Sequence, residues 1–313
     1  MGQYNRTIAE EFLFVGFSIE PRTNLCLFVI VLSMYLITLT GNTLIIIAIR
    51  IDPRLSTPMY FFLSNLSLLD ICYTTSVVPQ LLIHFLTSHK TISFNRCMAQ
   101  LFISLSLGSI EFILLAAMAY DRYVAVCHPL HYKTMMNKMV CIQLALTSWM
   151  GGLFNAMVQT GFTMRLRFCT FNTINHFACE VLAVIKLSCS ETFVNEISLM
   201  VAGVLLLLIP CIVVMLSYVY IIRAILHIRS SEGRHRAFST CTSHLTVVTL
   251  CYGTAAFAYL SPKAPTSSNQ NKMLAFFYAV VTPMLNPIIY SLRNKEVKGA
   301  LSKVVRKCIP VES

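Results

Sequence analysis

Seven long apolar segments dominate this chain of 313 residues and limit the folds open to it. They lie at approximately 25–49, 58–83, 97–120, 139–160, 197–222, 238–260 and 273–291. A bilayer core about 30 Å thick is crossed by roughly 20 mostly apolar residues in a helix. The segments are continuous, whereas a membrane β-barrel shows short stretches of alternating polarity. The pattern therefore predicts an all-α membrane protein, a bundle of seven transmembrane helices.

The composition argues against soluble alternatives. Apolar residues make up 56% of the chain and charged residues only 12%, against about 25% charge in an ordinary soluble domain. The formal net charge of +11 suggests a nucleic-acid partner, but so apolar a chain has no broad polar surface to offer a phosphate backbone. We therefore expect no nucleic-acid partner.

The placement of the basic residues predicts the orientation of the bundle. With the N-terminus outside, the inner connections and the tail hold 15 lysines and arginines in 63 positions, and the outer pieces hold 9 in 85. Positive charge marks the cytoplasmic side of a membrane protein. Residues 1–24 are thus predicted to be extracellular and residues 292–313 to form a cytoplasmic tail. Asn5, in an Asn-Arg-Thr triplet, is then an N-glycosylation acceptor.

Four of the twelve cysteines lie on the predicted outer side, one at the start of span three and three in the loop 161–195. They are Cys97, Cys169, Cys179 and Cys189. An oxidising compartment favours disulfides, and four cysteines allow three pairings, among which the spacing does not choose. His176 and Glu180 beside Cys179 suggest a soft metal site, but a cysteine in a disulfide cannot bind a metal. We therefore favour a disulfide framework in the loop 161–195.

Several short motifs resemble the rhodopsin-like G-protein-coupled receptors. The motif residues are Asp121-Arg122-Tyr123 at the end of span three, Asn286-Pro287-Ile288-Ile289-Tyr290 at the end of span seven, and Asn42, Asp70 and Pro210 inside spans one, two and five. Four longer blocks are similar to the signatures of the olfactory receptors, in their tetrapod-type class. The blocks are Thr57–Ser67, Met118–Tyr132, Arg236–Leu245 and Pro283–Asn294. The resemblance extends from about Asn5 to Lys307.

This resemblance implies a function and partners. The expected protein is an odorant receptor, not an enzyme, that binds small volatile and mostly apolar molecules. It would activate a heterotrimeric G protein of the stimulatory, olfactory type and raise cyclic AMP. The expected location is the plasma membrane of olfactory cilia, with membrane lipid and receptor-transport chaperones as further partners.

The resemblance also implies roles for individual residues. It pairs Cys97 with Cys179 and Cys169 with Cys189. These bonds would make the loop a firm lid over a ligand pocket inside the bundle. Asp121 and Arg122 would form a latch that opens when a G-protein helix enters the bundle. The residues expected to act in activation and coupling are Asp121, Arg122, Tyr123, Tyr218, Arg236, His244, Asn286, Pro287 and Tyr290. Tyr218 and Tyr290 would turn toward Arg122 in the open state.

Two carboxylates lie well inside the spans, where charge is costly. Asp70 and Glu111 would repel each other unless one is protonated or a cation lies between them. The family resemblance suggests a sodium ion near both in the inactive state. A neutral, hydrogen-bonded Glu111 is an equally good interpretation, and no other cofactor is expected.

The predicted ligand pocket is apolar with a few hydroxyls and amides, the usual composition of a small-molecule site. The outer half of span three has no acid to pair with an amine, and segment 273–291 has no lysine for a retinal Schiff base. By family position the pocket is lined by Leu101, Ser104, Leu105, Gly108, Ser109, Asn155, Ala202, Leu206, Tyr252, Ala255, Ala256, Tyr259 and Ala279. Plain helix packing is the alternative role of the apolar members.

The pattern in residues 294–307 predicts a short amphipathic helix on the membrane surface, with Val297 and Leu301 inward and Lys298 outward. Cys308 beside it is either a palmitoylation site or a free thiol. Two other functions are weighed. A non-olfactory chemosensory receptor for a small metabolite would share every motif. A transporter or channel would show internal repeats and paired broken helices, and neither is visible in the sequence.

Overall fold

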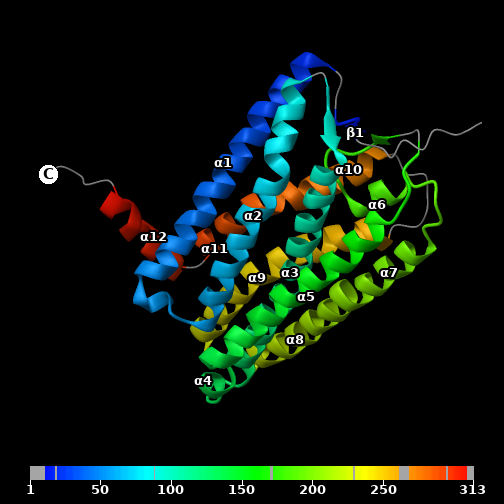
Figure 1. Ribbon diagram of the computed structural model, residues 1–313. Coiled ribbons are helices and arrows are strands. Elements are labelled where there is room, and N and C mark those ends of the chain that lie inside the picture. The colour runs from blue at the N-terminus through cyan, green and yellow to red at the C-terminus, as the bar shows by residue number, and fades with distance from the viewer. Residues whose placement is uncertain are drawn as a thin grey trace, which may run out of the picture.

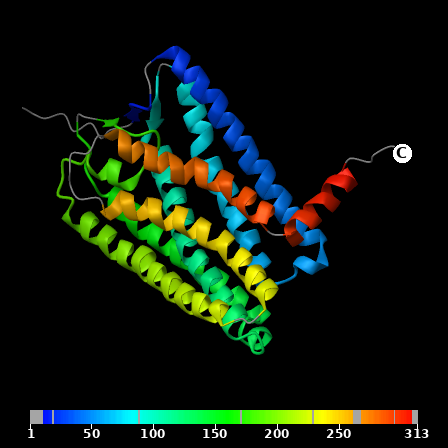
Figure 2. The same ribbon diagram turned by 180° about the vertical axis from the view of Figure 1, so that it is seen from behind.

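A computed structural model describes residues 11–17, 20–87, 89–169, 172–227, 230–260, 268–293 and 295–308. Figures 1 and 2 show a bundle of long helices seen from two opposite sides. Five of its rods are single helices, namely α1 (Pro21–Ile51), α2 (Pro58–Leu86), α3 (Phe94–Cys127), α5 (Lys138–Met164) and α9 (Ser231–Leu260). The rod between α5 and α9 is continuous through α7 (Phe193–Gly203), η2 (Val204–Leu208) and α8 (Ile209–Leu226). The last rod is continuous through α10 (Ser268–Phe276), η3 (Phe277–Val281) and α11 (Thr282–Arg293). The predicted glycosylation acceptor Asn5 lies outside the described residues.

Six of these rods are long and apolar enough to cross a membrane. The seventh, α9, is as long as the others but less apolar, partly because it is rich in threonine. Each threonine hydroxyl from Thr242 to Thr254 donates to a carbonyl of the preceding helical turn, as Thr246 does to Thr242 O at 2.7 Å. These bonds satisfy the hydroxyls within the helix itself. The chain therefore forms the predicted seven-helix bundle.

The helices extend beyond the predicted apolar segments at most of their ends. The third rod begins at Phe94 and ends at Cys127, where the apolar pattern predicts 97–120. Hydropathy records only the part of a helix that needs hydrocarbon around it, whereas the backbone hydrogen bonds continue into the polar interface. Pro21 and Pro58 start the first two rods, since a proline at the first position loses no helical hydrogen bond.

Helix α3 runs through the centre of the bundle and contacts α2, α5, α8 and α9. The main apolar core lies around the middle and the C-terminal half of α3, with Ile110, Leu114 and Leu115 fully buried. On the far side, α1 packs against α2 and α11. Asn42 of α1 donates to the Pro283 carbonyl at 3.2 Å, which joins the first rod to the last.

Short elements cap the two ends of the bundle. One end carries a three-stranded sheet in the order β2 (Thr91–Ser93), β1 (Glu11–Phe14), β3 (Thr173–Ile174), and we call it the sheet end. The loop helix α6 (Val181–Ile185) lies there as well. At the opposite end lie η1 (Pro53–Leu55), α4 (Tyr132–Met135) and α12 (Lys295–Cys308).

The sheet was not expected from the sequence. Strand β1 pairs antiparallel with β2, with Phe12 opposite Ile92, and parallel with β3, with Leu13 opposite Thr173. Burial alternates along β1, so that Phe12 and Phe14 face inward. Phe12 packs edge-on against Phe168 with ring centroids 5.4 Å apart. The N-terminal strand thus closes over the sheet end and packs onto the top of α3.

The tail contains the predicted short amphipathic helix, α12. Val297 and Ala300 are buried and Lys298 is exposed. Tyr60 at the start of α2 donates to the Glu296 carboxylate at 2.8 Å. This contact fixes the first turn of α12 against the bundle. The side chain of Cys308 lies outside the described residues.

Candidate ligand pocket and coupling site

Two disulfides hold the loop between α5 and α7. The helix disulfide, Cys97–Cys179, joins the start of α3 to this loop, with 5.5 Å between the two Cα atoms. The loop disulfide, Cys169–Cys189, closes the loop on itself. Both pairs are the ones that the family resemblance implies. The Cys179 amide also donates to Gln100 Oε1 at 2.9 Å, and Gln100 donates to the Ser76 carbonyl at 3.0 Å. The loop is thereby tied to both α2 and α3.

The histidine of this loop belongs to the same structural unit. His176 Nε2 lies 3.1 Å from Glu180 Oε2, and its ring stacks on Phe177 with centroids 4.5 Å apart. Across the part of the chain that the structure describes, no three histidine, cysteine or acidic side chains form a metal-binding group. The His176–Glu180 pair therefore serves the packing of the loop.

Polar side chains of the predicted pocket meet between α3 and α5, in the half of the bundle nearer the sheet end. Asn155 donates to the Ser109 hydroxyl at 2.9 Å. Gln159, one turn further along α5, lies 3.5 Å from Asn155 Oδ1 and donates to Ser198 Oγ of α7 at 2.9 Å. A chain of hydrogen bonds thus connects three helices across the predicted pocket.

Gln159 and Ser198 were missed by the sequence prediction. Gln159 lies four residues after Asn155, which places the two side chains on one helix face. That spacing is the signal by which Gln159 could have been found. Ser198 carries no comparable signal, because its contact depends on how α7 packs against α5.

Tyr252 of α9 packs against α3 and is only 5% exposed. Its hydroxyl donates to the Phe112 carbonyl at 2.7 Å, and the two rings lie 5.2 Å apart. The hydroxyl proton is therefore already used by the protein. Within the described structure, this leaves the ring and the oxygen lone pairs of Tyr252 for contact with a ligand.

The other predicted lining residues divide into two groups. Leu101 is buried under the sheet beside Phe12 and Phe168, and Ala279 is buried in a separate cluster with Phe177. Half-buried residues of the predicted lining on α3, α7, η2 and α9 are Ser104, Leu105, Ala202, Leu206 and Ala256, while Gly108 and Ala255 are buried. The side chain of Tyr259 lies outside the described residues.

The two intramembrane carboxylates each have a hydrogen-bond donor from the last rod. Asn286 donates to both oxygens of Asp70, at 3.2 and 3.0 Å. Tyr278 donates to Glu111 Oε2 at 2.8 Å. Asn286 Oδ1 and Asn42 Oδ1 are buried without a hydrogen-bond partner among the described residues. Asp70, Glu111 and the unpaired Asn286 oxygen beside Asp70 are hard oxygen donors of the kind that suits a small cation.

The predicted latch differs from the contact that the structure shows. Asp121 is fully buried and accepts a hydrogen bond from the Tyr132 hydroxyl of α4 at 2.7 Å. Among the described side chains, Asp121 and Arg122 form no ion pair within 4 Å, and Arg122 Nε is buried without a hydrogen-bond partner. Adjacent residues on a helix point about 100° apart, so Asp121 pairs with the following loop instead. Burial, and then the neighbouring Asp121 charge, raise the pKa of Tyr132, which keeps this donor protonated.

The predicted activation residues on α8 and α9 contact each other. Tyr218 donates to the Cys241 carbonyl at 3.1 Å, and its oxygen lies 2.8 Å from His244 Nδ1. One proton cannot serve both contacts, so His244 donates from Nδ1 when Tyr218 donates to Cys241. The buried Tyr290 hydroxyl has no partner within the described part of the chain.

Three further residues were predicted to act in coupling, namely Tyr123, Pro287 and Arg236. The Tyr123 hydroxyl lies 3.1 Å from His128 Nε2. Pro287 approaches α1 at Gly41, where an added Cβ would lie 3.0 Å from the proline Cγ. Arg236 belongs to the described backbone of α9, but its side chain lies outside the described residues.

Comparison with known proteins gives the family of the chain. Residues 31–307 match the family described as olfactory receptor. The chain belongs to the olfactory receptor family. It is 55% identical to human olfactory receptor 2F1 over 307 residues, which cover 98% of this chain and 97% of that protein. It is 53% identical to the dog olfactory receptor-like protein OLF3, over 100% of this chain and 99% of that protein. Human olfactory receptor 2F2 is 54% identical, with 97% and 96% covered.

Family membership gives the class of activity. Olfactory receptors are G-protein-coupled receptors and not enzymes, so this chain is an odorant receptor that signals through a G protein. Its apolar helices place it in the plasma membrane as a multi-pass protein.

A buried lysine in this olfactory receptor corrects one sequence-based expectation. The apolar pattern places the start of span seven at residue 273, and so leaves Lys272 in a loop. In the structure Lys272 lies inside α10, is only 4% exposed, and donates to the Gly16 carbonyl at 2.9 Å. The last rod therefore does contain a buried lysine, at the sheet end, where it holds the N-terminal segment.

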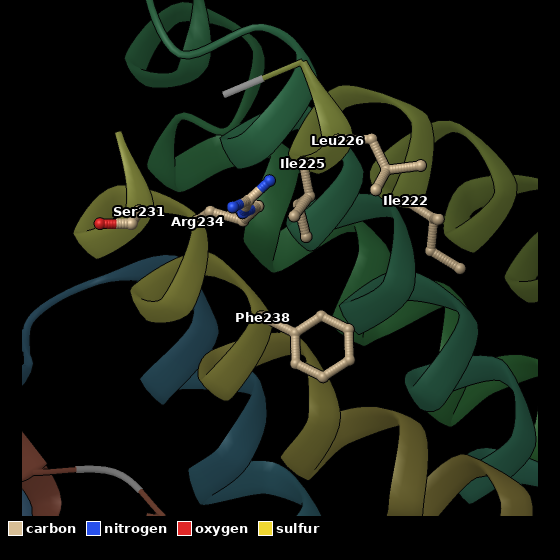
Figure 3. A pocket seen from close by; sticks show the side chains of 6 residues that line it. All are labelled: Ile222, Ile225, Leu226, Ser231, Arg234 and Phe238. Carbon is tan, nitrogen blue, oxygen red and sulfur yellow. The ribbon is translucent and has the colours of Figure 1, made fainter. Parts of the chain in front are cut away.

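A groove lies between α8 and α9 at the opposite end of the receptor (Figure 3). Its volume is about 520 Å³. The lining residues are Ile222, Ile225, Leu226, Ser231, Arg234 and Phe238. None of them belongs to the predicted odorant pocket. The groove borders the stretch of α9 that precedes Arg236.

Proposed function

We propose that this olfactory receptor binds small volatile, mostly apolar molecules in the half of the bundle nearer the sheet end. It then activates a stimulatory, olfactory-type G protein and raises cyclic AMP. The observation that carries the proposal is the hydrogen-bonded set of Ser109, Asn155 and Gln159 between α3 and α5, in the part of the bundle that the disulfide-tied loop covers. A few placed polar groups in an apolar site are typical of small-molecule recognition.

The expected affinity is weak. A volatile ligand of roughly 10–12 heavy atoms, at about 0.5 kcal/mol per atom, gains about 5–6 kcal/mol on binding. That corresponds to a Kd of roughly tens to hundreds of micromolar. The ligand favours the active bundle only through its higher affinity for that state. We propose that the full lining is the predicted set from Leu101 to Ala279.

Activation is proposed to change the contacts around Arg122. Its guanidinium has an unpaired buried Nε, and Tyr218 with His244 now bridges α8 and α9. When the ends of these helices separate, Tyr218 and Tyr290 would turn toward Arg122, and a G-protein helix would enter beside Arg236.

A sodium ion is proposed to bind between Asp70 and Glu111 in the inactive state. The unpaired amide oxygen of Asn286, together with the two carboxylates, supports this assignment. A bound cation would offset the repulsion between the two acids.

The orientation and cellular partners are also proposals. The distribution of lysine and arginine supports an extracellular sheet end and a cytoplasmic C-terminal helix. On this orientation Asn5 is available for glycosylation. We further propose residence in olfactory cilia, contact of the basic inner surface with membrane lipid, and passage to the surface with transport chaperones.

Cyclic AMP measured in transfected cells against a panel of diverse volatiles tests the function. Arg122→Ala is expected to abolish the ligand-dependent rise at equal surface expression. Ser109→Ala removes the hydroxyl that Asn155 contacts and is expected to lower potency. Ser106→Ala is its matched control, because the Ser106 hydroxyl bonds to the Phe102 carbonyl of its own helix at 2.8 Å. A receptor that signals equally well without Arg122 would contradict the coupling mechanism.

A further inference from the structure

Tyr278 lies where the predicted odorant pocket meets the buried carboxylates. Its hydroxyl donates to Glu111 Oε2 at 2.8 Å. Gly108 lies on α3, as Glu111 does, and a Cβ added to it would lie 3.1 Å from the Tyr278 oxygen. Gly108 belongs to the predicted ligand lining and Glu111 to the predicted ion site. One phenol group therefore touches both sites, and neither prediction included it.

The ring of Tyr278 packs against two neighbouring helices. Its ring packs edge-on against Tyr73 of α2 at 5.4 Å and stacks on Phe112 of α3 at 6.3 Å. The adjacent Phe277 is 44% exposed on the outside of the bundle. Tyr278 itself remains half-buried. The ring is therefore held against α2 and α3, beside the proposed pocket.

The local backbone favours this placement. Tyr278 lies in η3, a π-helical segment of five residues inside the last rod. Such segments shift the side-chain register of a helix and occur often at functional sites. Gly108 has no side chain, so the phenol oxygen packs directly over its backbone, where an added Cβ would lie only 3.1 Å away. A ligand that lies along this part of α3 therefore meets the phenol oxygen.

We propose that Tyr278 reports ligand occupancy to Glu111, and that the ligands it senses carry a hydrogen-bond-accepting oxygen, as ketones, aldehydes and esters do. The proposal deepens the proposed odorant-receptor function and rests on it. A ligand carbonyl oxygen next to the phenol accepts a hydrogen bond from the Tyr278 hydroxyl, which stays protonated. Glu111 then loses the donor that it has in the described state.

The consequence follows from the cost of burial. A buried carboxylate that loses a hydrogen-bond partner is destabilised unless it finds another. Cys251 of α9 also interacts with Glu111. Loss of the Tyr278 bond therefore leaves Glu111 dependent on α9, the helix that also contacts Tyr218 through His244. This gives a physical path from a ligand carbonyl to the helix that bounds the coupling site.

The test uses Tyr278→Phe, which removes the hydroxyl and keeps the ring. Tyr35→Phe is the matched control, because the Tyr35 hydroxyl lies 3.0 Å from Thr75 Oγ1, between α1 and α2. Basal and ligand-dependent cyclic AMP are measured, at equal surface expression, with pairs of volatile ketones and hydrocarbons of the same carbon skeleton. Loss of one hydrogen bond is expected to lower ketone potency about two- to tenfold. Hydrocarbon potency should not fall, and basal signalling should rise.

Glu111→Gln keeps an acceptor oxygen for Tyr278 and supplies a second variant. It should retain the preference for ketones over hydrocarbons that Tyr278→Phe loses. Equal loss of potency for both members of each pair would show a purely structural role and overturn the proposal. So would an unchanged ketone response in Tyr278→Phe, or a wild-type receptor that responds to hydrocarbons and to no carbonyl compound. If no volatile activates the wild type, the proposed function itself fails.

Discussion

Replacement of Gly152 by alanine is expected to force α3 and α5 apart. An added Cβ would collide with the Ile110 side chain and lie 2.7 Å from the Ser106 carbonyl oxygen and 2.9 Å from the Ile110 amide nitrogen. Backbone atoms cannot rotate away as a side chain can, so the helices themselves must shift. Ser106 and Ile110 flank the pocket residues Gly108 and Ser109, and the displacement should therefore reach the ligand site.

The magnitude follows from a comparison within the same helix. At Gly161 of α5 an added Cβ meets nothing within 4 Å. Both substitutions gain the helix preference of alanine over glycine, about 1 kcal/mol. Their difference therefore isolates the steric cost, which is about 1–3 kcal/mol for overpacking and falls in the upper part of that range where backbone is involved. Gly151→Ala should be intermediate, because its Cβ would lie 3.1 Å from a movable atom, Cδ1 of Ile113.

Apparent melting temperature of the purified receptor in detergent is a suitable assay, with surface expression measured in parallel. We expect Gly152→Ala to melt roughly 5 °C below Gly161→Ala. Equal midpoints for these two variants would refute the close approach of α3 and α5. A higher midpoint for Gly152→Ala would do so more strongly.

Three further predictions concern contacts at the two ends of the bundle. Tyr132→Phe removes the hydroxyl that donates to the buried Asp121 carboxylate. The variant is expected to lose about 1.5–3 kcal/mol of folding stability, measured as a lower apparent melting temperature. An unchanged melting temperature would argue against this hydrogen bond. Lys272→Met should release the N-terminal strand and speed amide hydrogen exchange in β1, while the exposed-lysine control Lys186→Met should not. Replacing both cysteines of the helix disulfide by serine should lower the free energy of unfolding by about 4.5 kcal/mol, because this bond joins residues 82 positions apart. The same replacement in the loop disulfide, whose cysteines are 20 positions apart, should lower it by about 3 kcal/mol. Equal surface expression of the two variants would contradict this order.

The number and approximate position of the spans could be predicted from the sequence because hydrocarbon imposes a length and a composition on each helix. The limit of that argument is visible at Lys272. A hydropathy boundary cannot tell that a lysine one residue outside the apolar run is buried, because its burial depends on the N-terminal segment that covers it. The helix end at Cys127 lies beyond the predicted span for a different reason, because the helix continues past the hydrocarbon that the hydropathy records.

Strand β1 shows a second limit. The four residues Glu11–Phe14 form a strand only because β2 and β3 supply partners about 80 and 160 positions away. The segment is too short for its own pattern to specify a sheet. The contact of Asp121 with Tyr132 is similar, since the sequence places Asp121 beside Arg122 but does not show which side chain faces it.

By itself the sequence determined the seven crossings, the receptor family and the set of polar residues inside the membrane, because hydropathy and motifs are properties of neighbouring residues. The tertiary structure alone decided how those residues are paired. Glu111 receives its hydrogen bond from Tyr278, 167 positions away, and Asp70 from Asn286, 216 positions away. Such pairs are set by the distances between packed helices, and no local pattern in the chain encodes those distances.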